Sequence, residues 1–141
     1  MEHARIQPRR PPAMFTATTI VQMLVRISGL TAVVLGLLFW TGNVLNLIPL
    51  HMLAGALLVL SVWALAFLAA WAGVSWDLVV LALLWGLLVP VFGMTQTQLL
   101  PGDAHWLIQV LHLLVGMTAM GLGQALATRI KQVQTLAHPA E

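Results

Sequence analysis

Residues 50–72 read LHMLAGALLVLSVWALAFLAAWA, a run without a single Asp, Glu, Lys or Arg. A helix needs about 20 predominantly apolar residues to cross the hydrocarbon core of a bilayer, so this run is long enough to span a membrane. Three further predominantly apolar runs of similar length lie at residues 20–40, 76–96 and 104–128, and the charged residues within them are Arg26 and Asp77. The sequence therefore predicts an all-α integral membrane protein, a four-helix bundle in contact with the lipid bilayer.

The composition of the whole chain also indicates lipid as its main solvent. Of the 141 residues, 60% are hydrophobic and only 7% are charged, whereas about a quarter of the residues are charged in an ordinary soluble domain. Six Lys and Arg are too few for a phosphate-binding surface, which excludes nucleic acid as a partner. The chain has no cysteine, which excludes disulfides, thiolate metal sites and covalently attached haem.

The polar segments divide the chain into an N-terminal arm at residues 1–18, a four-span bundle at residues 19–131 and a C-terminal tail at residues 132–141. All Lys and Arg lie at the two chain ends or near them, and the loops at residues 43–49 and 97–103 contain none. Basic residues collect on the cytoplasmic side of a membrane. We therefore expect both termini in the cytoplasm, both of these loops outside, and a place in a bacterial inner membrane.

An internal repeat relates the two halves of the bundle. Residues 50–55, LHMLAG, are matched by residues 111–116, LHLLVG, at an offset of 61. Upstream, four glycines match pairwise at an offset of 57: Gly29 with Gly86, and Gly36 with Gly93. The repeat predicts two helical hairpins, at about residues 19–72 and 76–128, that cross the membrane in the same direction. We interpret the four glycines as small residues that allow neighbouring helices to approach closely.

Two histidines inside the spans carry the functional prediction. The repeat places His51 and His112 at the same depth, and an ionisable residue within a span usually faces the bundle interior and marks a functional site. Each is followed four residues later, on the same helix face, by a glycine, Gly55 or Gly116. The missing side chains leave room for a flat macrocycle, and imidazole ligands from both sides suit the iron of a haem. We therefore expect His51 and His112 to bind one haem b iron near the outer face.

The paired motifs His51-x-x-x-Gly55 and His112-x-x-x-Gly116 on a four-span plan resemble the four-helix membrane b-type cytochromes. In that family, paired histidines on neighbouring spans clamp one haem. The resemblance covers the arrangement of spans and the two motifs, and it implies an electron carrier rather than an enzyme.

His105 and Gln109 lie on the same face of the fourth run as His112, toward its outer end. His105 could there hydrogen-bond a haem propionate, bind a quinone head group or face water. We expect both residues to line the outer mouth of the cofactor site, where a quinone or a redox partner would exchange electrons.

Two other interpretations stay open from the sequence. In the first, the chain is a structural accessory subunit of a larger membrane complex, and the two histidines only form hydrogen bonds between helices. In the second, the histidines bind a chlorophyll-type pigment or copper in place of haem. The spans contain no nucleophile with a base, no carboxylate pair and no phosphate loop, so a hydrolase or transferase is not expected.

Overall fold

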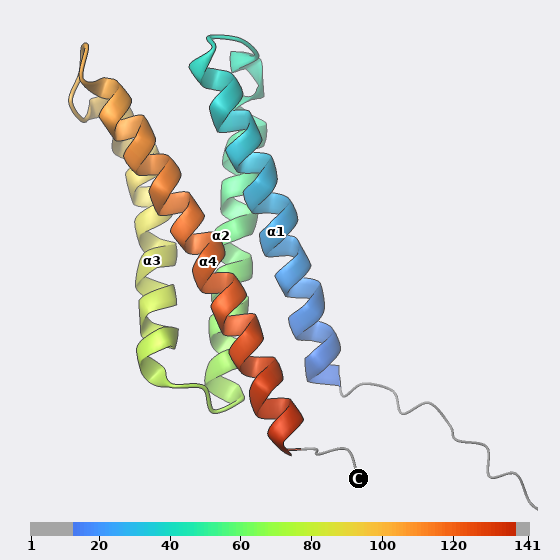
Figure 1. Ribbon diagram of the computed structural model, residues 1–141. Coiled ribbons are helices and arrows are strands. Elements are labelled where there is room, and N and C mark those ends of the chain that lie inside the picture. The colour runs from blue at the N-terminus through green and yellow to red at the C-terminus, as the bar shows by residue number, and fades with distance from the viewer. Residues whose placement is uncertain (1–12, 138–141) are drawn as a thin grey trace, which may run out of the picture.

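The computed structural model describes residues 13–137 and has the expected all-α fold. Four helices run along this part of the chain: α1 (Ala13–Trp40), α2 (Ile48–Trp71), α3 (Trp76–Thr95) and α4 (His105–Ala137). Each helix is long and apolar enough to cross a membrane. Figure 1 shows that they alternate in direction, up and down, as a bundle. The chain is thus an all-α four-helix bundle of the integral membrane type.

The helices at the two chain ends are longer than the apolar runs predict. Helix α1 begins at Ala13, so residues 13–18 of the expected arm are helical, and α4 continues to Ala137 through most of the expected tail at residues 132–141. An apolar run measures the thickness of the hydrocarbon core, whereas the backbone hydrogen bonds of a helix can continue beyond it. The rest of the arm, residues 1–12, and residues 138–141 lie outside the described residues.

The two hairpins, α1–α2 and α3–α4, enter the bundle in the same direction, as the repeat predicts (Figure 1). Helices α2 and α4 contact each other and form the central pair, and each of them also contacts both α1 and α3. This arrangement corresponds to a two-fold axis between α2 and α4. We call the end where α1 begins and α4 ends the terminal end, and the end that carries the α1–α2 and α3–α4 connections the loop end.

The best-buried part of the core lies toward the terminal end, and it follows the repeat. Four positions of α2 and their partners at an offset of 61 on α4 are all buried: Leu58 and Ala119, Leu65 and Leu126, Ala66 and Ala127, and Ala69 and Ile130. In Figure 1 the two hairpins stand apart at the loop end. The symmetric core therefore holds the hairpins together at the terminal end.

Two of the matched glycines allow the hairpins to approach each other, as interpreted from the sequence. A Cβ atom added at Gly29 of α1 would lie 2.6 Å from the Met120 side chain of α4. A Cβ atom added at Gly86 of α3 would overlap the Trp63 indole of α2. Each glycine thus packs against a side chain from the second helix of the other hairpin. The two contacts correspond to each other, as expected for a two-fold axis.

Candidate functional site

The His51 and His112 side chains face each other across the contact between α2 and α4. Their ring centroids lie 6.2 Å apart, and the ring planes are inclined by 52°. His51 lies in the first turn of α2, and His112 lies two turns into α4, so the pair belongs to the loop-end half of the bundle. Both side chains are half-buried. The repeat alone therefore located two imidazoles that meet in space although 61 residues separate them.

The His51 ring is oriented by helix α1. Its Nδ1 lies 3.0 Å from the backbone carbonyl oxygen of Ala32. Because a carbonyl oxygen only accepts, Nδ1 carries the proton and donates, and Nε2 keeps a free lone pair. Gly36, one turn further along α1, lies beside the ring, and an added Cβ there would be in ordinary van der Waals contact with His51 Cε1 at 3.5 Å. A histidine fixed in this way by a backbone carbonyl has the tautomer and orientation of a typical metal ligand.

His112 has the equivalent glycine but not the equivalent hydrogen bond. An added Cβ at Gly93 of α3 would lie 3.1 Å from His112 Cε1. The His112 Nδ1 is buried and has no hydrogen-bond partner among the described residues. A buried polar atom without a partner costs about 1–3 kcal/mol, so such an atom calls for an explanation in terms of function or a bound group.

An aromatic ring packs against each histidine from the first helix of the same hairpin. Phe39 of α1 meets His51 edge-on, with 5.5 Å between ring centroids, and Phe92 of α3 stacks on His112 at 6.0 Å. These contacts restrict the two imidazoles to a few orientations. The two phenylalanines could not be found from the repeat, because they do not match at its offset.

The space beside the two motif glycines is open. A Cβ atom added at Gly55 or Gly116 would meet no heavy atom within 4 Å. Each glycine lies one turn deeper in the membrane than its histidine and on the same helix face. The residues present therefore leave room along both helices next to the imidazole pair.

The distance between the rings fits two ligands on opposite sides of one metal ion. Two metal–nitrogen bonds of about 2 Å, with about 1.1 Å from each nitrogen to its ring centre, would separate the centroids by roughly 6 Å. Within residues 13–137, no group of three or more His, Cys, Asp or Glu side chains could hold a metal ion. The pair would supply two nitrogen donors to a metal centre that brings its remaining ligands with it, as the iron of a haem does.

The other two predicted site residues have different partners. His105, at the start of α4, lies with Nδ1 3.1 Å from the Leu99 carbonyl oxygen in the α3–α4 connection. Gln109 accepts a hydrogen bond from the Trp40 indole N–H at the end of α1. The structure therefore brings together His51 and His112, and it gives His105 and Gln109 other partners near the loop end: the α3–α4 connection for His105 and the end of α1 for Gln109.

The fold and the site define an all-α membrane four-helix bundle with two histidines paired inside its spans. Comparison of the chain with protein-family models, with curated proteins and with solved structures finds no match. The function is therefore inferred from the residues of this chain.

Proposed function

We propose that the chain is a membrane electron-transfer protein that binds one haem b through axial bonds to His51 and His112. The observation that carries the proposal is the 6.2 Å separation of two imidazole rings on the central helices. Three further features support it: the fixed tautomer of His51, the buried Nδ1 of His112 without a partner, and the open space beside Gly55 and Gly116.

When bound, haem supplies reversible one-electron chemistry at its iron. The chain holds the two imidazoles level, on α2 and α4, the central pair of the bundle. The Ala32 carbonyl keeps the proton on His51 Nδ1, which leaves Nε2 as the donor atom toward a metal. Apolar neighbours, Phe39 and Phe92, limit the access of water to the rings.

We further propose that the loop end faces the outside of a bacterial inner membrane and that both chain ends are cytoplasmic. Two observations support this orientation: α1 and α4 have their chain ends at the same end of the bundle, and the loops at residues 43–49 and 97–103 carry no Lys or Arg. The site then lies near the outer face, where a quinone or a redox protein would exchange electrons with it. His105 and Gln109, at this end, are the residues nearest to such a partner along α4.

A structural subunit of a larger membrane complex is the second candidate function, and one contact favours it. The hydrogen bond from His51 Nδ1 to the Ala32 carbonyl joins α1 to α2, which is the role that a purely structural histidine would have. The Nδ1 of His112 is buried without a hydrogen-bond partner, and a purely structural role does not explain this.

Absorption spectra of the detergent-purified protein, oxidised and then reduced, distinguish the two functions. We expect a Soret band that shifts on reduction and sharp visible bands of a six-coordinate haem. His51→Ala and His112→Ala should each abolish the six-coordinate spectrum, because each removes one axial ligand. His105→Ala is the matched control and should keep it, since the His105 ring bonds the α3–α4 connection.

A colourless protein with full helical content by circular dichroism would reject the haem and favour the structural subunit. Strong absorption in the far red would instead indicate a chlorophyll-type pigment. Loss of the spectrum in His105→Ala but not in His51→Ala would reject the assigned ligand pair.

A further inference from the structure

A polar network joins α1 and α4 at the terminal end, far from the histidine pair. Lys131 Nζ donates to Gln22 Oε1 at 2.7 Å, and Gln22 Nε2 donates to Gln124 Oε1 at 2.8 Å. The same Gln124 oxygen also accepts from Arg26 Nε and Nη2, at 3.0 and 2.9 Å. Two cations thus bond to neutral amides, and most of their N–H groups remain available to another acceptor.

The repeat shows that packing does not require this network. The symmetry-related contact, between α2 and α3, is built from apolar side chains at all four corresponding positions: Val79 for Gln22, Leu83 for Arg26, Trp63 for Gln124 and Ala70 for Lys131. There the helices are joined by a single bond from the Trp63 indole to the Leu83 carbonyl, at 3.2 Å. One half of the duplicated fold holds two cations where the other half holds hydrocarbon, which indicates a function for the cations.

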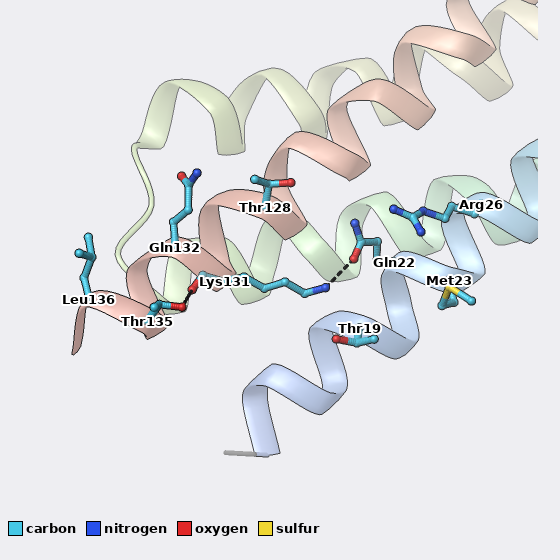
Figure 2. Close-up of a pocket in the computed structure, with 9 residues that line it drawn as sticks. All are labelled: Thr19, Gln22, Met23, Arg26, Thr128, Lys131, Gln132, Thr135 and Leu136. Atoms are coloured by element: carbon cyan, nitrogen blue, oxygen red, sulfur yellow. Dashed lines mark hydrogen bonds between the residues drawn. The ribbon is translucent and has the colours of Figure 1, made fainter. Parts of the chain in front are cut away.

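Three members of the network, Gln22, Arg26 and Lys131, line a surface groove of about 710 Å³ between α1 and α4. Figure 2 shows the Lys131 side chain reaching across the groove from α4 to Gln22 of α1, with Arg26 further along α1. Met23 and Leu136 add apolar surface to its lining. The groove therefore combines cationic N–H donors with an apolar wall.

The groove lacks a negative charge of its own. Among the described residues the only carboxylates are Asp77, on α3, and Asp103, in the α3–α4 connection, and neither lines this groove. A second groove at the same end contains both Arg129 and Asp77, so its charges balance. Of these two grooves, the α1–α4 groove is thus the one whose described lining carries two cations and no carboxylate.

The depth of the two cations in the membrane indicates which kind of anion they would bind. Arg26 lies about 21 Å from Trp40 along α1, which is inside a hydrocarbon core of about 30 Å if Trp40 marks the outer boundary. The Lys131 Nζ bonds to Gln22 Oε1, and Gln22 lies about 27 Å from Trp40 along α1, at the inner edge of the same core. A ligand that reaches both levels has an anionic head and an apolar chain.

We propose that the α1–α4 groove binds the phosphate headgroup of an anionic phospholipid, with its acyl chain against Met23 and the neighbouring apolar surface. Arg26 and Lys131 provide charge-assisted hydrogen bonds to the phosphate oxygens. Gln22 and Gln124 position the two cations on either side of the groove. The inference is independent of the haem, since the groove lies at the opposite end of the bundle.

Native mass spectrometry of the full-length protein in a neutral detergent tests this site, with phosphatidylglycerol or phosphatidylcholine added at equal concentrations. We expect one phosphatidylglycerol retained per chain and little phosphatidylcholine. Arg26→Gln and Lys131→Gln should each weaken retention about fivefold, from the loss of one cation near the membrane surface. Arg129→Gln is the matched control, because it removes the same charge two residues away on α4 and should leave retention unchanged.

Equal retention of the two lipids by the unmodified protein would overturn the proposal without reference to any variant. The proposal would also fail if Arg129→Gln weakened retention as much as Lys131→Gln. The lipid would then be attracted by the net charge of the protein and not by this groove. Full displacement of the lipid by millimolar glycerol 3-phosphate would assign the groove to a soluble phosphate and would likewise overturn the lipid assignment. Helical content by circular dichroism verifies that each variant is folded.

Discussion

At the scale of single residues, the two histidines are not equivalent in spite of the repeat. His51 satisfies its Nδ1 through the Ala32 carbonyl, whereas the Nδ1 of His112 is buried without a partner. The orphaned nitrogen costs about 1–3 kcal/mol unless a bound group changes its surroundings. A residue kept at such a cost is better accounted for by a ligand than by packing.

The difference between the two histidine environments predicts opposite effects of replacing them in the protein without the proposed haem. His112→Leu should raise the free energy of unfolding by about 1 kcal/mol, because it replaces an unsatisfied polar group by an apolar one. His51→Leu should lower it by about 1 kcal/mol, because it leaves the loop-end contact between α1 and α2 without its hydrogen bond. Thermal unfolding in detergent, followed by circular dichroism, measures both. Equal effects of the same sign would show that the two environments do not differ as described.

At the scale of helices, the glycines decide how closely the two hairpins pack. Gly29 faces the flexible end of Met120, while Gly86 faces the rigid indole of Trp63. The flexible side chain can move aside for an added methyl group, whereas the indole is held by its bond to the Leu83 carbonyl. The α2–α3 contact at Gly86 therefore tolerates an added methyl group less well than the α1–α4 contact at Gly29 does.

Gly86→Ala should therefore lower the free energy of unfolding by about 1–3 kcal/mol, as overpacking of a filled contact does. Gly29→Ala should cost much less. Gly121→Ala serves as control, because an added Cβ there meets nothing within 4 Å and alanine favours the helix by up to about 1 kcal/mol. Chemical unfolding in mixed micelles compares the three variants. A larger loss for Gly29→Ala than for Gly86→Ala would contradict the packing described here.

Helix positions could be predicted from the sequence wherever a turn interrupts an apolar run. The ends of α2 and α3 fall within two residues of the expected spans. Pro49 suits the first turn of α2, and Gly73, with a φ of 79°, ends the chain's helical course after α2. The start of α1 and the end of α4 could not be predicted in this way. Beyond the hydrocarbon core, helix length depends on backbone hydrogen bonding, which hydropathy does not measure.

At the scale of the whole molecule, the duplication explains which site residues could be predicted from the sequence and which could not. His51 and His112 could be paired in advance because they match in the repeat. Gln22, Arg26, Gln124 and Lys131 could not, because each is an isolated polar residue without a counterpart in the other copy. A comparison of the two copies for positions where one is polar and the other apolar would have found them.

The orientation of the bundle can be tested because the chain contains no cysteine. We expect Thr97→Cys, in the α3–α4 connection, to react with a membrane-impermeant maleimide added from outside intact cells. Ser75→Cys, in the α2–α3 turn, and Thr135→Cys, near the end of α4, should react only after the membrane is permeabilised, because both lie at the terminal end. The reverse pattern would invert the proposed orientation. Labelling of Thr97→Cys and Ser75→Cys from the same side would contradict the four-span topology itself.

We infer that His51 and His112 bind the same iron, and the ratio of haem to purified chain measures this. With haem supplied during expression, we predict one haem per chain in the unmodified protein and none in the double variant His51→Ala, His112→Ala. A double variant that kept one haem per chain, or an unmodified protein that remained folded without any, would contradict the claim.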